Sequence, residues 1–120
     1  MAKHYQVLII GGGTAGIMTA AQLIKQRGVD NIAIVEPADT HYYQPAWTLV
    51  GAGTYSFEKT AKPMVSVIPK GVQWIKDKAT GFHPEKNTVH TEKSDDITYD
   101  YLVVAPLKLL ITCHVCFGSV

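Results

Sequence analysis

The 120-residue sequence predicts an α/β fold, in which a parallel sheet built on a β-α-β unit is joined by a three-stranded antiparallel meander. Two apolar runs, at 7–10 and 31–35, flank a stretch with helical periodicity at 14–26, which is the pattern of a β-α-β unit. Three short segments between 78 and 99, separated by turn-forming residues, have the spacing of a meander. The content of 47% hydrophobic and 18% charged residues suits one globular domain or a part of one.

The first apolar run is expected to form a strand buried on both faces, because its four residues are consecutive and are stopped by glycines. The helix after it has one apolar face, formed at i, i+3, i+4 and i+7 by Ile17, Ala20, Ala21 and Ile24. Lys25 and Arg27 are expected in its last turn, where cations favour the helix dipole, and Gly28 is expected as a left-handed stop. The second apolar run then completes the unit.

The remaining elements are shorter. One brief helix is expected after Pro45 and another before Pro63. Strands are expected at 72–75, then at 78–82, 88–91 and 97–99 for the meander, and finally at 101–105 as a separate buried strand.

A glycine loop joins the first strand to the first helix. In the G-x-G-x-x-G pattern, Gly11 permits the tight turn, Gly13 lets the backbone approach a pyrophosphate, and Gly16 keeps the helix close to the sheet. The pyrophosphate would meet free N–H groups at Thr14 and Ala15. A glycine-rich turn that binds nothing is the alternative, but the strand before the loop and the amphipathic helix after it favour a Rossmann-like dinucleotide site.

Glu36 adds to this prediction because it ends the second strand, 20 residues after Gly16. A carboxylate at that place accepts hydrogen bonds from ribose hydroxyls and disfavours the 2′-phosphate of NADP. An NAD dehydrogenase would continue into another helical crossover, whereas this chain continues into an aromatic loop, the meander and "YDYLVVAP". That order favours FAD.

Four segments carry a family resemblance over about residues 4–106: "VLIIGGGTAGIMTAAQL", "NIAIVEPADTHYYQPAWTLVGAG", "SVIPKGVQWIKDKAT" and "YDYLVVAP". They resemble the N-terminal part of sulfide:quinone oxidoreductases, nearest to the branch with the mitochondrial enzyme and its bacterial relatives. The resemblance implies non-covalently bound FAD, sulfide oxidised at a redox-active cysteine pair, and electrons passed through the flavin to a membrane quinone.

Carried over by position, the resemblance implies a set of FAD contacts and no catalytic residue. The pyrophosphate would be held by Gly11, Gly13, Thr14, Ala15 and Gly16. Glu36 would bind the adenosine ribose, and Gln44 would lie in the contact shell of the cofactor. Ala79 would make backbone contact near the adenine, and Ala105 would end the strand that passes the pyrophosphate.

The chain departs from the family pattern at residue 107, where the family has a glycine and this sequence has Leu107. Residues 1–106 are therefore interpreted as the N-terminal part of an FAD/NAD(P)-binding domain, an incomplete domain, and 107–120 as an atypical tail. The C-x-x-C at Cys113 and Cys116 lacks a second pair of ligands and does not match the family cysteines, so no metal site is predicted.

Three readings of function stay open. The first is the FAD-binding N-terminal portion of a sulfide:quinone oxidoreductase-like flavoprotein. The second is a truncated or non-catalytic FAD- or nucleotide-binding fragment, and the third is a flavoprotein like the type II NADH dehydrogenases. A plain NAD-binding domain is a weaker rival.

Partners and location follow from charge and resemblance. The formal charge of +1, with acids and bases interspersed, does not indicate nucleic-acid binding. The chain opens without a secretory or Arg-rich leader, so the expected location is cytoplasmic. The resemblance implies sulfide and quinone as partners of the full-length relative, a mitochondrial location in a eukaryote, and peripheral membrane contact through regions absent from this chain.

Several histidines and tyrosines could have a functional role, but a structural role is the expected one. His41 and the tyrosines at 42 and 43 could line a flavin pocket, although aromatic residues in such loops usually only pack. His83 and His90 are expected to be solvated or at a sheet edge.

Overall fold

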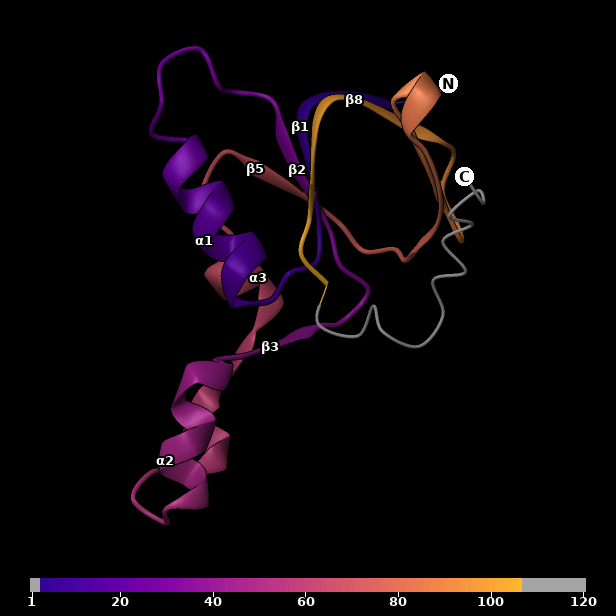
Figure 1. Cartoon of the computed structure of the whole chain (residues 1–120). Helices are drawn as coiled ribbons and strands as arrows, with labels where there is room; N and C mark the ends of the chain where they lie inside the picture. The colour runs from indigo at the N-terminus through magenta and orange to yellow at the C-terminus, as the bar shows by residue number, and fades with distance from the viewer. Residues whose placement is uncertain (1–2, 107–120) are drawn as a thin grey trace, which may run out of the picture.

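The computed structural model describes residues 3–106, which form a six-stranded mixed sheet, a two-stranded sheet and short helices (Figure 1). The strand order in the large sheet is β5-β2-β1-β8-β7-β6. Its strands are β1 (Lys3–Ile10), β2 (Ile32–Val35), β5 (Val72–Ile75), β6 (Ala79–His83), β7 (Thr88–Thr91) and β8 (Ile97–Val104). The small sheet pairs β3 (Thr40–Tyr42) with β4 (Ala61–Pro63). The helices are α1 (Thr14–Leu23), α2 (Trp47–Gly51) and α3 (Met64–Val67), with 3-10 turns η1 (Gln44–Ala46), η2 (Phe57–Thr60) and η3 (Pro84–Lys86).

The predicted β-α-β unit is confirmed. Strand β1 pairs in parallel with β2 from Val7 opposite Ile32 to Ile10 opposite Val35, and α1 connects them. The helix ends earlier than predicted, because i→i−3 bonds from the N–H groups of Lys25 and Gln26 replace the helical pattern after Leu23. Its last turn therefore contains no basic residue, contrary to the prediction. Gly28 has a positive φ of 80° but lies in the following turn rather than at the helix end.

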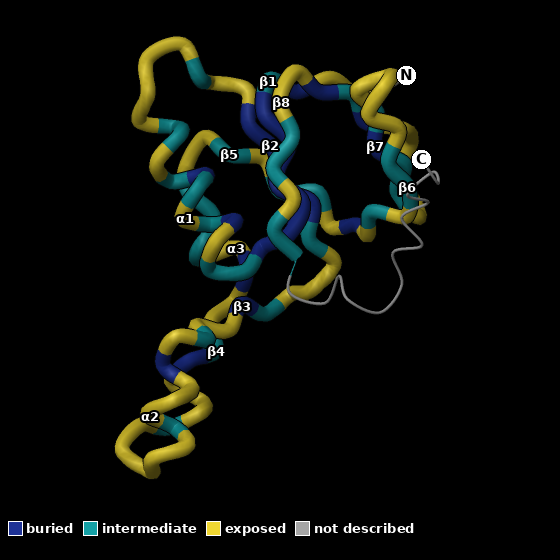
Figure 2. Tube along the Cα trace, viewed as in Figure 1, coloured by how far each residue is buried: buried dark blue, intermediate teal, exposed yellow. Residues whose placement is uncertain are grey.

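Two apolar layers bury the central strands, which are the dark core in Figure 2. On one face, α1 packs over a cluster of Val7, Ile9, Ala20, Ile32 and Ile34. On the other face, the meander packs over a larger cluster, formed by Tyr5, Leu8, Ile10, Ala33, Val35, Val89, Ile97 and Tyr99. Burial on both faces explains why β1 and β2 are continuous apolar runs.

The meander is confirmed, with β6-β7 and β7-β8 both antiparallel. The two strands expected at 97–99 and 101–105 are instead one strand, β8, which pairs with β1 in parallel from Ile97 to Val104. The prediction that its second half is buried is wrong, since the exposed fractions are 68% for Tyr101 and 45% for Val104. Strand β7 pairs only with Ile97 and Thr98, so the later residues of β8 have no strand of residues 3–106 on that side.

An arm formed by residues 40–63 projects from the sheet (Figure 1). The predicted helix after Pro45 is α2, and the one before Pro63 is the 3-10 turn η2, while α3 after Pro63 was not predicted. Most of the arm is exposed (Figure 2), and its ring contacts join Tyr42, Trp47 and Phe57. Within residues 3–106, no helix has the length and apolar character needed to cross a bilayer.

Candidate nucleotide-binding site

The glycine loop lies between the ends of three parallel strands. The N–H of Gly11 donates to the Val35 carbonyl at 3.0 Å, and the N–H of Ala105 donates to the Ile10 carbonyl at 2.8 Å. Gly11 has a φ of +108°, and a Cβ there would lie 2.4 Å from the Ala105 carbonyl oxygen. The turn at the end of β1 therefore requires glycine, as predicted.

The helix N-terminus is held against this turn by Gly16. A Cβ at Gly16 would lie 1.9 Å from the carbonyl oxygen of Gly11, which no side chain can tolerate. The structure thus confirms that Gly16 lets the helix pack closely against the end of the strand.

The first turn of α1 offers open hydrogen-bond donors. No protein atom lies within 4 Å of a Cβ built on Gly13, so this glycine faces open space rather than a neighbouring segment. The first helical bond runs from the N–H of Ile17 to the carbonyl of Gly13, which leaves the earlier N–H groups of the helix without helical acceptors. The hydroxyl of Thr14 is buried and has no hydrogen-bond partner among the described residues. An anionic ligand with several oxygens fits this set of donors.

Glu36 stands beside the loop, at the end of β2. Its Oε2 accepts the N–H of Gly12 at 2.8 Å, and its Oε1 accepts the N–H of Ala38 at 2.9 Å. Each carboxylate oxygen has further acceptor capacity for a hydroxyl donor. A carboxylate fixed at this point can accept hydrogen bonds from a ribose diol and disfavours a 2′-phosphate on that ribose.

Two residues that orient this site were not predicted to do so. His41 is buried, and its Nδ1 donates to the carbonyl of Gly12 at 2.9 Å. The indole Nε1 of Trp74 donates to the backbone carbonyl of Glu36 at 2.9 Å. Both contacts join residues about 30 to 40 positions apart, so local sequence patterns carry no signal for them.

The structure brings some predicted site residues together and leaves others apart. Gly11, Gly16 and Ala105 meet at the turn, and Thr14 and Ala15 begin the helix that follows it. Gln44 begins η1 in the arm, three residues after His41. Ala79 begins β6 and packs against the apolar layer under the meander. Cys113 and Cys116 lie outside the described residues.

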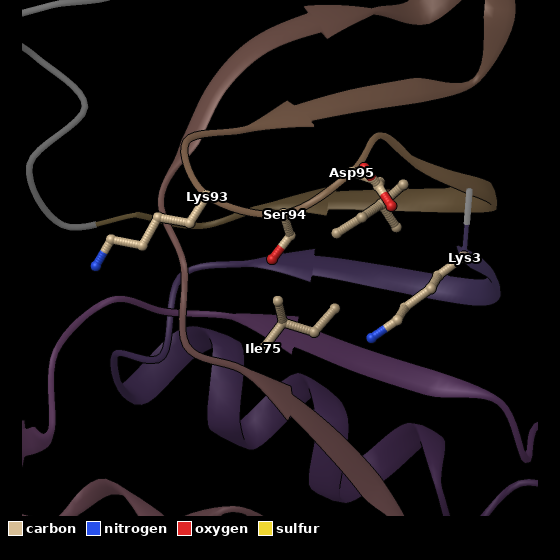
Figure 3. Close-up of a pocket in the computed structure, with 6 residues that line it drawn as sticks. Lys3, Ile75, Lys93, Ser94 and Asp95 are labelled. Carbon is tan, nitrogen blue, oxygen red and sulfur yellow. The ribbon is translucent and has the colours of Figure 1, made fainter. Parts of the chain in front are cut away.

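A cavity of about 280 Å³ lies on the meander side of the sheet (Figure 3). It is lined by Lys3, Ile75, Lys93, Ser94, Asp95 and Ile97. None of these is a residue of the glycine loop or a predicted cofactor contact, so the cavity is separate from the candidate site.

Asp77 is a buried carboxylate that fixes the neighbouring turn. It accepts the N–H groups of Lys78 at 2.7 Å, Ser94 at 2.8 Å and Lys93 at 3.1 Å. Burial alone would raise the pKa of Asp77, but these hydrogen bonds outweigh it and lower the pKa to about 2. Because its oxygens accept backbone N–H groups from two turns, the one after β5 and the one after β7, Asp77 has a structural role.

Residues 5–106 match the family model described as "Pyridine nucleotide-disulphide oxidoreductase". The chain is 45% identical over 103 residues to the mitochondrial sulfide:quinone oxidoreductase of Mus musculus, covering 86% of this chain and 23% of that protein. It is 31% identical over 103 residues to a type II NADH:quinone oxidoreductase of Staphylococcus saprophyticus, covering 83% of this chain and 25% of that protein.

The X-ray structure of sulfide:quinone oxidoreductase from Aquifex aeolicus superposes with a TM-score of 0.70 at 34% identity, covering 88% of this chain and 24% of that one. The chain spans about a quarter of the length of the curated relatives that it matches. The family match covers nearly all of residues 3–106. The chain belongs to the pyridine nucleotide-disulphide oxidoreductase family.

Proposed function

We propose that this chain is the FAD-binding N-terminal portion of a sulfide:quinone oxidoreductase-like flavoprotein. One observation carries the proposal: the glycine loop leaves Gly13 open and the Thr14 hydroxyl without a partner, while the Glu36 carboxylate stands at the adjoining strand end. The higher identity to the mouse sulfide:quinone oxidoreductase than to the type II NADH:quinone oxidoreductase supports this choice of subclass.

Each residue has a role in holding the cofactor. The pyrophosphate oxygens would accept N–H groups at Gly13, Thr14 and Ala15, and the Thr14 hydroxyl would donate to the same group. Glu36 would accept from the adenosine ribose hydroxyls with the acceptor positions not used by Gly12 and Ala38. Gln44, Ala79 and Ala105 would complete the contact shell.

FAD, when bound, supplies a carrier that accepts electrons from sulfide and delivers them to quinone in the whole enzyme. The part of that reaction assigned to residues 3–106 is binding and orientation, and no residue among them is assigned to the sulfur chemistry. A mitochondrial location in a eukaryotic source, and sulfide and quinone as partners, belong to the same proposal.

The test is a titration of the 120-residue chain with FAD and, separately, with NAD. We expect FAD to bind with its fluorescence quenched and to raise the melting temperature, whereas NAD leaves the melt unchanged. Stabilisation by NAD alone would assign a plain NAD-binding domain. Weak FAD binding together with aggregation and no cooperative melt would favour the truncated, non-catalytic fragment.

A chimera tests the subclass. Residues 5–106 would replace the matching segment of the mouse enzyme, and quinone reduction would be measured with sulfide and with NADH. Sulfide-dependent reduction supports the proposal. Reduction with NADH and none with sulfide would move the segment to the type II NADH dehydrogenases.

A further inference from the structure

Two histidines meet on the outer part of the meander, away from the glycine loop. His83 ends β6 and His90 lies on β7, where it pairs with Gly81. Their rings are edge to face, with centroids 4.5 Å apart and an interplanar angle of 82°. Both side chains are partly exposed, at 47% for His83 and 36% for His90.

The sequence permits this contact because His90 has a glycine opposite it. A Cβ at Gly81 would lie 3.4 Å from Cδ2 of the His90 ring, so the ring covers a position with no side chain. From there it reaches His83, two residues further along the partner strand.

Each ring has its own carboxylate. The Nδ1 of His83 contacts Oε1 of Glu85 at 3.4 Å, and the Nδ1 of His90 contacts Oδ1 of Asp96. Since a carboxylate only accepts, Nδ1 is the protonated nitrogen and Nε2 of the neutral ring retains its lone pair. A carboxylate on the far nitrogen is also the usual support of a metal-binding histidine.

The ring spacing suits a shared ion. With metal–nitrogen distances of about 2.0–2.1 Å, two imidazoles on one ion place their centres about 4.5–5 Å apart. Two carboxylates next to the rings also make the site attractive to a cation. Among residues 3–106, no group of three or more His, Cys, Asp or Glu is arranged to hold a metal, so the site has only two protein ligands.

We propose that His83 and His90 form a two-histidine site for a divalent transition-metal ion of the Ni²⁺ or Zn²⁺ type, bound through the Nε2 atoms. Imidazole is a preferred ligand of both ions. The proposal does not depend on FAD binding, because none of its residues belongs to the glycine loop.

The experiment titrates Ni²⁺ into the 120-residue chain by calorimetry, in a Cys113→Ser/Cys116→Ser background that removes the thiols. We expect His83→Asn and His90→Asn each to weaken Ni²⁺ binding about tenfold or more. Glu85→Gln and Asp96→Asn should each weaken Ni²⁺ binding about tenfold, which is the smaller effect known for residues that hydrogen-bond a metal ligand. His4→Asn is the matched control: His4 also contacts a carboxylate, that of Asp100, and within residues 3–106 its ring is not in contact with another histidine ring.

A residue-resolved measurement on the Cys113→Ser/Cys116→Ser chain with all its histidines intact does not depend on whether the histidine variants fold. Histidine ring ¹H–¹⁵N spectra should show Nδ1-protonated tautomers for residues 83 and 90, and Ni²⁺ should broaden these two signals before that of His4. Equal broadening of all histidine signals, or equal affinity in the His83→Asn and His4→Asn variants, would overturn the proposal.

Discussion

His41 donates its Nδ1–H to the carbonyl of Gly12, 29 residues earlier in the chain, at 2.9 Å. The N–H of the same glycine donates to Glu36 at 2.8 Å. The N–H and the carbonyl of one residue in the glycine loop are therefore both held by side chains, one from the end of β2 and one from β3.

Replacing His41 should separate a hydrogen-bonding role from a packing role. His41→Asn places an amide N–H where Nδ1 was, so we expect FAD affinity close to the unsubstituted value. His41→Leu fills the space but leaves the Gly12 carbonyl unpaired, at a cost of about 1–3 kcal/mol in the free energy of unfolding and a comparable loss of FAD affinity. Chemical denaturation and FAD titration measure both. Equal effects of the two variants would assign His41 to packing alone.

Two glycines of the loop should respond in opposite ways to alanine. At Gly13 a Cβ meets no protein atom, so Gly13→Ala should change the free energy of unfolding by no more than about 1 kcal/mol. The same methyl group occupies the space proposed for the pyrophosphate, and FAD affinity should fall about tenfold or more. Unchanged FAD affinity would place the ligand elsewhere.

At Gly16 the methyl group would lie 1.9 Å from the Gly11 carbonyl oxygen. Gly16→Ala should therefore destabilise the fold itself, by about 3 kcal/mol. The matched control is Gly51→Ala in α2, where a Cβ meets nothing within 4 Å. A melting temperature for Gly16→Ala equal to that of the control would contradict the packing argument.

Glu36→Gln should weaken FAD binding and relax selectivity. The amide keeps one oxygen for either Gly12 or Ala38 but presents an NH₂ group to the other N–H, and it removes the negative charge. We expect about a tenfold loss of FAD affinity, with 2′-phosphorylated nucleotides competing better than before. Competition titrations with NADP measure the second effect, and its absence would argue against Glu36 as the selective group.

Acid should destabilise the fold through Asp77. Its pKa of about 2 lies below the usual 3.8, so its contribution is fully present above about pH 4 and is lost as the pH falls from there towards 2. Asp77→Asn should be less stable at pH 7 by about 1–3 kcal/mol, because an amide cannot satisfy all of the backbone N–H groups. Its stability should change less than that of the unsubstituted chain between pH 4 and 2. Asp30→Asn, at an exposed position, is the control.

Local patterns predicted the β-α-β unit and the meander because both depend on contiguous apolar runs and turn residues. The same reasoning divided β8 in two at Asp100, the polar residue between the two predicted strands. The strand continues there because β1 pairs with it along its whole length. That pairing is tertiary, and no local window contains it.

The candidate site was likewise predictable only where it depends on spacing along the chain. The loop glycines and Glu36 have fixed spacing in the chain, so sequence alone named them. His41, Trp74 and Asp77 act through contacts with distant backbone groups, and the pairing of His83 with His90 depends on the register of β6 against β7. That register is set by the apolar pattern of the two strands and by the turn between them, not by the two histidines themselves.

The hydrogen bonds on Gly12 also bear on the thermodynamics of ligand binding. They exist between protein groups alone, so the loop is ordered when the chain folds and not when a ligand arrives. Binding then costs less conformational entropy, because the donors already point to where they are used. Conversely, in a variant that lacks the hydrogen bonds on Gly12, the ligand itself would have to order the loop. The loss of affinity would then appear mainly as an unfavourable binding entropy.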